Sequence, residues 1–238
     1  MPKHGKRYRE NLALVDRTKA YALAEAVGVI KSFRAPKFDE TVELHLRLGV
    51  DPRHADQQVR STVMLPAGTG KRVRIIAFAE GEAARLAQEA GADYVGTDEY
   101  VQRIQDGWLE FDVAVAVPQV MGKIGRLGRV LGPRGLMPNP RAGTVSQPED
   151  IGRTIQQLRQ GRVEFRVDRT SNLHIPVGKT SFTTEQLQEN LTAVLGAVMR
   201  ARPATVKGQY VRHVTLSTTM GPGLAIDINE AVNVRSAA

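Results

Sequence analysis

The stretch Pro66-Ala67-Gly68-Thr69-Gly70 separates two different strand patterns in the sequence. Before it, apolar and polar residues alternate from Thr41 to Leu48, the pattern of a strand with one buried and one polar face. After it, the run from Val73 to Ala79 is almost entirely apolar, as in a strand buried on both faces of a parallel sheet. A proline and glycine cluster between two such patterns predicts a domain boundary.

The sequence beyond this boundary alternates between short apolar strands and helices. A helical pattern through Ala83 and Ala90 precedes a short strand at Tyr94-Val95, and a second helix precedes the apolar run from Val113 to Val117. Strands that alternate with helices in this way favour a small parallel α/β unit. We therefore predict a central α/β domain over residues 68–159.

The two ends of the chain share an antiparallel α+β pattern. Apolar spacing predicts helices near residues 23–33 and 187–198, the second with a capping box at 183–186. Neither end alone contains enough strands for a stable sheet. We predict that residues 1–67 and 160–238 fold together as one split α+β domain. Residues 1–9 are expected to form a basic tail, and the segment after Gly223 is expected to be loose.

Composition restricts the class of protein. A net charge of +8 over 238 residues favours a polyanionic partner such as nucleic acid. The absence of cysteine removes disulfides and thiolate chemistry and fits the cytoplasm. No apolar run approaches the roughly 20 residues that cross a bilayer, so no membrane partner is expected. Aromatic residues make up 5% of the chain, too few for base stacking to dominate nucleic-acid binding.

Basic residues are spread unevenly over the predicted domains. Residues 1–67 contain 12 Lys and Arg against 8 Asp and Glu, and residues 160–238 contain 9 against 6. Residues 68–159 contain 12 against 11 and are nearly neutral. Long-range attraction for a polyanion is therefore expected mainly from the split outer domain.

The stretch from Gly122 to Gly143 is the most basic part of the central domain. It reads GKIGRLGRVLGPRGLMPNPRAG, and no Asp or Glu occurs between Val113 and Pro148. Such glycine and proline density favours a long shaped loop rather than a regular element. The loop is either a second RNA or tRNA contact or a solvated connection. Its basic residues are Lys123, Arg126, Arg129, Arg134 and Arg141.

No motif predicts catalysis. Gly68-Thr69-Gly70-Lys71 lacks the glycine and hydroxyl residue of a P-loop, because Leu65 and Arg72 occupy those positions. The glycines of the basic stretch do not have dinucleotide-binding spacing, and the histidines do not have metal-ligand spacing. We predict a protein that is not an enzyme and has no cofactor or metal. The alternative is a small α/β enzyme that holds a nucleotide in the glycine-rich basic loop.

Two further segments suit RNA. Arg162, Glu164 and Arg166 lie on one side of a predicted strand, where they either bind phosphate or form ion pairs with neighbours. The segment from Thr218 to Pro222 combines hydroxyls and an apolar side chain, which could bind a ribose with its 2′-hydroxyl. By spacing alone, an ordinary strand end is the better interpretation of this segment.

Several blocks, in their order and spacing from about Tyr8 to Pro222, resemble the universal ribosomal protein L-one family of the large subunit's mobile lateral stalk, and look bacterial. The blocks are Lys37-Phe38-Asp39-Glu40-Thr41-Val42-Glu43, Gly49-Val50-Asp51-Pro52-Arg53, Leu65-Pro66-Ala67-Gly68-Thr69-Gly70-Lys71, Leu131-Gly132-Pro133-Arg134-Gly135-Leu136-Met137-Pro138-Asn139-Pro140, Gly161-Arg162-Val163-Glu164-Phe165-Arg166 and Thr218-Thr219-Met220-Gly221-Pro222. The sequence departs from the family's pattern at Val167, where Asn is usual, and at Ser171, where Gly is common.

The resemblance implies a split α+β sandwich with an inserted Rossmann-like three-layer α/β domain. It also implies a monomer within the cytoplasmic ribosome that binds large-subunit ribosomal RNA, assists release of deacylated tRNA from the exit site and represses its own operon's messenger RNA. The RNA-binding residues that it implies are Lys37, Phe38, Thr41, Arg162, Glu164, Arg166, Thr219, Met220 and Gly221.

Overall fold

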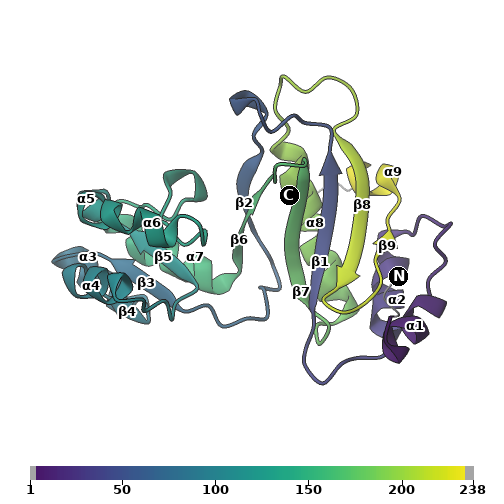
Figure 1. Ribbon diagram of the computed structural model, residues 1–238, viewed down its shortest axis with the longest axis horizontal. Coiled ribbons are helices and arrows are strands. Elements are labelled where there is room, and N and C mark those ends of the chain that lie inside the picture. Colours follow the sequence, from purple (N-terminus) through teal and green to yellow (C-terminus); the bar gives the residue numbers. More distant parts are fainter. Residues whose placement is uncertain (1–3, 234–238) are drawn as a thin grey trace. The chain divides into compact units, whose positions relative to one another are not determined.

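The computed structural model describes residues 4–233 and contains two compact units (Figure 1). One unit, here called the outer unit, runs up to Gly70 and resumes at Gly161. The other, the inserted unit, is Lys71–Gln160. The mixed α/β class expected from the sequence is confirmed, since residues 4–233 contain three sheets and several helices. That the two units are independent domains stays a prediction.

The outer unit is built on a sheet in which one N-terminal strand lies between C-terminal strands. The order is β7 (Asn172–Lys179), β1 (Thr41–Leu48), β8 (Val211–Thr218) and β9 (Leu224–Ala225), and all neighbours are antiparallel. The predicted alternation in β1 is confirmed, because every second side chain from Val42 to Leu48 is buried. The N-terminal strand β1 therefore pairs on both sides with strands from the C-terminal part of the chain.

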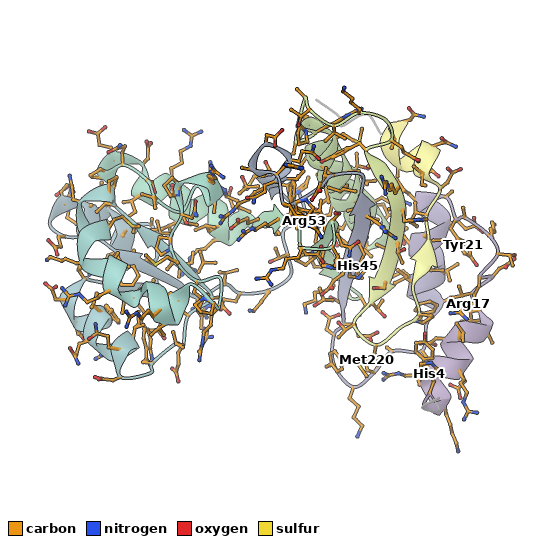
Figure 2. The ribbon with its side chains drawn as sticks, turned by 45° about the horizontal axis from the view of Figure 1, so that its top comes forward. His4, Arg17, Tyr21, His45, Arg53 and Met220 are labelled. Atoms are coloured by element: carbon orange, nitrogen blue, oxygen red, sulfur yellow. The ribbon has the colours of Figure 1, made fainter. Side chains whose placement is uncertain are left out.

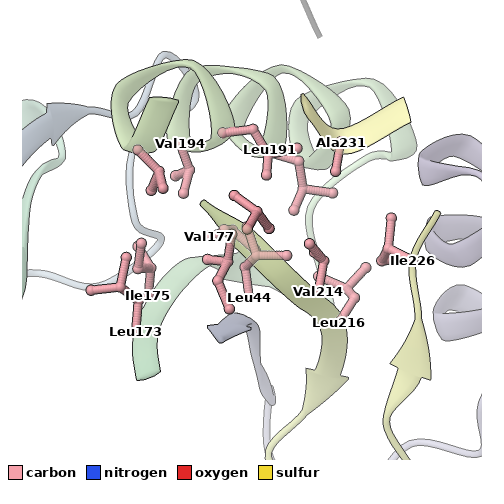
Figure 3. Packing of buried hydrophobic residues seen from close by; sticks show 14 of the residues in the cluster. Leu44, Leu173, Ile175, Val177, Leu191, Val194, Val214, Leu216, Ile226 and Ala231 are labelled. Atoms are coloured by element: carbon pink, nitrogen blue, oxygen red, sulfur yellow. The ribbon is translucent and has the colours of Figure 1, made fainter. Parts of the chain in front are cut away.

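Helices cover one face of this sheet. They include α2 (Leu23–Ser32) and α8 (Thr184–Arg200), and Figure 3 shows Leu191 and Val194 of α8 packed over the strands. The predicted capping box of α8 is confirmed: the Thr183 hydroxyl accepts the Gln186 N–H, and the Gln186 side chain accepts the Thr183 N–H. The opposite face of the sheet carries polar residues.

A two-stranded ribbon completes the outer unit. It pairs β2 (Arg60–Met64) with β6 (Arg162–Arg166) in antiparallel register, after a short 3-10 helix, η1 (Ala55–Gln57). The predicted strand that carries Arg162, Glu164 and Arg166 is confirmed as β6. Phe165 is buried in the outer core, whereas Glu164 and Arg166 remain exposed.

The inserted unit contains the predicted parallel sheet. Its order is β4 (Tyr94–Val95), β3 (Ile75–Phe78) and β5 (Val113–Ala116). The central strand β3 is completely buried, which explains its apolar sequence. The larger helices of the unit are α3 (Glu82–Glu89), α4 (Asp98–Gln105) and α7 (Ile151–Gln160), the last preceded by a 3-10 turn, η5 (Pro148–Asp150).

The prediction of a long loop over Gly122–Gly143 is wrong for its first half. After η2 (Pro118–Val120), the chain forms consecutive helical turns: α5 (Met121–Ile124), η3 (Gly125–Leu127) and α6 (Gly128–Leu131). Ile124, Leu127 and Leu131 recur at helical spacing and are fully buried in the inserted core. Their burial supplies the stability that glycine-rich composition alone does not. The second half is irregular apart from η4 (Pro140–Ala142).

Both terminal expectations also need correction. Helix α1 (Lys6–Ala13) begins inside the expected basic tail, and the Asn11 side chain bonds to the backbone of Arg34. After Gly223, β9 and α9 (Ile228–Asn233) are ordered, because Leu224, Ile226 and Ala231 are buried in the outer core. The first part of the expected tail, residues 1–3, and the last residues, 234–238, lie outside the described part of the chain.

Candidate nucleic-acid interface

One end of the outer sheet brings together two segments that are far apart in the sequence. One segment leads into β1 and the other follows β8, and they meet because Val42 is the antiparallel partner of Thr218. We call the predicted residues gathered here the sheet-end cluster. It consists of Lys37, Phe38, Thr41, Thr219, Met220 and Gly221.

Hydrogen bonds fix the backbone of the sheet-end cluster. The Thr41 N–H donates to the Thr219 hydroxyl at 3.1 Å, and the Thr219 N–H donates to the Thr41 carbonyl at 3.1 Å. The Met220 N–H donates to the carboxylate of Glu40 at 2.9 Å, and Glu40 is only 3% exposed. The exposed turn is therefore tied to a buried side chain, which holds it in one position.

The sheet-end cluster exposes apolar side chains on this fixed backbone. Phe38 and Met220 are each 51% exposed, and Figure 2 labels Met220 at the end of β8. Lys37 is also exposed and adds a positive charge. An apolar surface beside a cation and hydroxyl groups can pack against a ribose or base and bind the neighbouring phosphate.

Gly221 is needed for this turn to close. A Cβ atom at this position would lie 2.4 Å from the Thr218 hydroxyl oxygen and 3.2 Å from the Phe33 ring. The Thr218 hydroxyl is itself buried and has no hydrogen-bond partner within residues 4–233. The glycine allows the turn to pack directly on the end of the core.

The sheet-end cluster is supported by three residues of β7 and the following turn that the sequence did not predict: Lys179, Thr180 and Ser181. The Lys179 ammonium donates to the Thr41 hydroxyl at 2.9 Å. Asp39 accepts hydrogen bonds from the Thr180 hydroxyl and from the hydroxyl and N–H of Ser181. Slight burial opposes ionisation of Asp39, but these bonds lower its pKa. Their proximity follows from the Thr41–Lys179 register, which spacing along the sequence does not reveal.

The β6 residues lie on the exposed face of the two-stranded ribbon. Glu164 and Arg166 are exposed, and Arg162 is half-buried on the same side. Glu164 forms an ion pair with Arg60 of β2, so the neighbour-pairing interpretation is confirmed for this carboxylate. The Arg166 guanidinium has no partner among residues 4–233, which leaves it available to an anion.

The polar face of the sheet contains a histidine pair that the sequence did not predict. The Nδ1 atoms of His45 and His174 are 2.8 Å apart, and the His45 Nε2 lies 2.9 Å from the Ser217 hydroxyl (His45 is labelled in Figure 2). Burial and the neighbouring His174 lower the pKa of His45, while Glu43 opposes the shift. Strand alternation placed His45 on the polar face, but its partner depends on the β1–β7 register.

The turn after β6 explains the two departures from the family pattern. Val167 is buried and donates its N–H to the Val59 carbonyl at 2.9 Å, so its side chain belongs to the core. Ser171 has a positive φ of 68°, a conformation that favours glycine, and its hydroxyl donates to the Val50 carbonyl at 2.8 Å. This hydrogen bond compensates for the less favourable backbone conformation.

The basic stretch of the inserted unit presents fewer available charges than its sequence predicts. The Lys123 ammonium donates to Glu80 at 2.6 Å and to Asp98 at 3.2 Å, and these bonds raise its pKa. The other four basic residues of the stretch are arginines. They are exposed, and their guanidinium groups have no partner within residues 4–233. We call these four residues the arginine set: Arg126, Arg129, Arg134 and Arg141.

Residues 4–233 show neither a metal-binding group nor a membrane-spanning helix. They contain no group of three or more histidine and acidic residues arranged to hold a metal ion. None of their helices has the length and apolar character that a membrane-spanning helix needs.

Comparison with known proteins decides the family. The sequence profile of the Ribosomal protein L1p/L10e family matches residues 30–222. The chain belongs to this family. A large ribosomal subunit protein uL1 from Chloroflexus aggregans is 56% identical over 236 residues, which cover 99% of this chain and 100% of the relative. The uL1 proteins of Thermomicrobium roseum and Chloroflexus aurantiacus are 55% and 54% identical over 98% and 99% of this chain, and over 97% and 100% of their own length.

Membership in the Ribosomal protein L1p/L10e family settles the class of protein. The resemblance inferred from the sequence blocks is confirmed, as is the expected location on the ribosome. The chain is a structural ribosomal protein and not an enzyme, so the alternative of a nucleotide-binding enzyme is wrong.

Proposed function

We propose that this protein is a component of the large ribosomal subunit that binds ribosomal RNA mainly through its outer unit. The sheet-end cluster and the exposed face of β6 form the main contact, and the arginine set forms a second contact. The protein acts as a monomer within the ribosome. The observation that carries this proposal is the pair of exposed apolar side chains at this end of the sheet: Phe38, which precedes β1, and Met220, whose N–H donates to the buried Glu40.

The finer parts of the proposal concern tRNA and messenger RNA. We propose that the protein assists release of deacylated tRNA from the exit site, with the arginine set as the group that meets a mobile RNA. Four exposed guanidinium groups without internal partners suit phosphate contacts that do not depend on sequence. We also propose that the sheet-end cluster binds a similar RNA structure in the protein's own messenger RNA and thereby represses its translation.

The test of the main contact compares two equally exposed apolar residues. Met220→Ala should weaken binding to a large-subunit ribosomal RNA fragment by about 1–3 kcal/mol, the scale of a lost buried contact. Leu14→Ala is the matched control, because Leu14 is also 51% exposed but lies at the end of α1. Both variants should keep their stability, since substitutions at exposed sites change it little. Affinity is measured by filter binding over a series of salt concentrations.

The same assay defines what would contradict the proposal. Affinity should fall steeply as salt rises, and a folded ribosomal RNA fragment should bind much better than duplex DNA. If Thr219→Ala and Met220→Ala leave binding intact while replacement of the arginine set abolishes it, the main contact lies in the inserted unit. Sequencing of RNA that co-purifies with the protein identifies the bound segments, including any from its own messenger RNA.

A further inference from the structure

A groove in the outer unit lies between the β2 segment and helix α8, and nothing above assigns it a role. Its volume is about 780 Å³. Thr62 and Met64 line one side, and Glu185 and Glu189 line the other. Met64 is 40% exposed, so the groove contains a large apolar side chain in contact with solvent.

The β2 side of the groove is an unpaired strand edge. The Val167 N–H donates to the Val59 carbonyl, and the Leu65 N–H donates to the Gly161 carbonyl, which fixes the hydrogen-bonded pairs of the β2–β6 ribbon. Because such pairs alternate in an antiparallel ribbon, the N–H and C=O groups of Thr62 and Met64 point away from β6. Within residues 4–233, β6 is the only strand that pairs with β2.

An unpaired edge of this kind is a template for another extended chain. Edge strands bind partners through main-chain hydrogen bonds, and the neighbouring side-chain pockets supply the specificity. Here the pocket is formed by Met64 and by the exposed surface of α8. The edge therefore offers both hydrogen-bonding groups and an apolar anchor point to an added strand.

The α8 side of the groove determines the charge of the added strand. Glu185 and Glu189 are four residues apart, lie on one face of α8 and are exposed. Neither has an ion-pair partner within residues 4–233. Arg200 also lines the groove, so its two carboxylates leave an excess of one negative charge there, although the protein as a whole carries a net charge of +8. This excess disfavours the phosphates of nucleic acid and favours lysine and arginine.

We propose that this groove binds an extended segment of another protein that carries lysine or arginine. The segment adds as a third strand to the free edge of β2. Its apolar side chains pack on Met64, and its cations pair with Glu185 and Glu189. Met64 is the antiparallel partner of Arg162, so the added segment reaches the margin of the ribbon face proposed for ribosomal RNA. Glu185 and Glu189 on α8 lie outside the residues proposed for RNA, so they distinguish the two partners.

The test uses the full-length protein and a capped peptide of alternating lysine and valine as the probe. Binding is followed through the backbone amide signals of the 15N-labelled protein. The Thr62 and Met64 signals should shift, and a peptide of alternating glutamate and valine should bind at least tenfold more weakly. Equal binding of the two peptides, or shifts confined to other surfaces, would overturn the proposal.

Two sets of variants make the test specific. Thr62→Pro removes the outward N–H without breaking a β6 hydrogen bond, whereas Thr62→Val retains it, so only the proline variant should lose peptide binding. Should the proline variant fail to fold, E185Q/E189Q still tests the charge: it should weaken peptide binding at least tenfold and leave ribosomal RNA affinity unchanged.

A dimer in light scattering that Thr62→Pro abolishes would assign the edge to a second copy and overturn the proposal. Loss of RNA affinity in E185Q/E189Q would also overturn it.

Discussion

The sheet-end cluster and the arginine set differ in how firmly the fold holds their side chains. In the sheet-end cluster, the Met220 N–H is bonded to the buried Glu40, and the Gly221 turn packs directly against Phe33. In the arginine set, buried leucine and isoleucine hold the helical turns, but the guanidinium groups project without partners among residues 4–233.

This difference suits the two groups to two different kinds of proposed RNA contact. A fixed turn with apolar and hydroxyl groups can discriminate one RNA shape from another, because it cannot adjust to a wrong one. Long, unpaired arginines can reach phosphates in many arrangements and therefore suit a moving partner. The comparison favours the outer unit for anchoring and the inserted unit for transient contact.

The largest expected effect concerns Asn190, which fixes the chain where it leaves the outer unit. Its amide is completely buried, accepts the Ala67 N–H at 3.0 Å, and donates to the carbonyls of Gly68 at 3.0 Å and Val177 at 2.7 Å. Asn190→Ala should destabilise the outer unit by about 3 kcal/mol, because it leaves buried backbone groups unpaired. Urea unfolding followed by circular dichroism measures the loss.

The single tryptophan supplies an internal control for this measurement. Trp108 packs in the inserted unit, so its fluorescence follows that unit alone. Asn190→Ala should leave the fluorescence transition in place, and the exposed Asn229→Ala should change neither transition. A shift of the fluorescence transition by Asn190→Ala would show that the two units do not unfold separately.

The role of Asn190 also shows what sequence reasoning could and could not predict. Helix α8 was predictable because its apolar stripe and its capping box at Thr183 are local features. The strands β1 and β3 were predictable for the same reason, from alternation and from continuous apolarity. Asn190 forms hydrogen bonds with Ala67 and Gly68, which are more than a hundred residues away. Such contacts cannot be predicted from local sequence patterns.

The two wrong predictions, a loop from Gly122 and a loose segment after Gly223, also arose because local patterns do not show long-range contacts or burial. The helical turns from Met121 to Leu131 were not predicted, because their three buried apolar residues lie among glycines that lower helix propensity. The order after Gly223 depends on Tyr21, which exchanges backbone hydrogen bonds with Ala225 and Asp227 from the far end of the chain. In the candidate site, the residues of the sheet-end cluster were identified through family resemblance. Their support by Lys179 and Asp39 required the strand register.

The next prediction concerns acid stability of the inserted unit. Partial burial opposes ionisation of Asp112, but hydrogen bonds from Lys71 at 2.7 Å and from the Arg74 N–H at 3.0 Å lower its pKa to about 2. The unfolded pKa is about 4, so this stabilisation is complete above about pH 4 and is lost as pH falls toward about 2. It amounts to about 2 kcal/mol, since one pKa unit corresponds to about 1.4 kcal/mol.

Trp108 fluorescence measures this effect directly. Urea unfolding at pH 7 and near pH 2.5 should show the inserted unit losing most of this stabilisation in acid. Asp112→Asn should lower the stability at pH 7 and should reduce the acid-dependent loss relative to the unchanged protein. If both proteins lose the same amount on acidification, the pH dependence arises from other carboxylates.

A smaller effect on stability is expected from Gly221→Ala, with a clear effect on RNA binding. The added methyl group must displace the Thr218 side chain or the Phe33 ring, which costs about 1–2 kcal/mol of stability. The displaced turn should weaken ribosomal RNA binding by about tenfold, equivalent to about 1.4 kcal/mol. Gly125→Ala is the control, because nothing lies within 4 Å of a Cβ atom there. Equal RNA affinity of the two variants would mean that the rigid turn does not contribute to binding.

The smallest expected effect on anchoring comes from removing the inserted unit altogether. The two crossings of the chain lie side by side: a Cβ atom on Gly161 would be 2.6 Å from the Gly68 Cα, and the Leu65 N–H bonds to the Gly161 carbonyl. Residues 71–160 can therefore be replaced by a short glycine and serine linker at little entropic cost. If the outer unit is an independent anchoring domain, the shortened protein should fold and bind the ribosomal RNA fragment within about threefold of the full chain, less than about 0.7 kcal/mol in binding free energy.

Introducing Met220→Ala into the shortened protein should weaken binding as much as it does in the full chain, because the cluster's contacts lie within the outer unit. If the shortened protein folds but loses RNA affinity, the arginine set and not the sheet-end cluster is the main anchor.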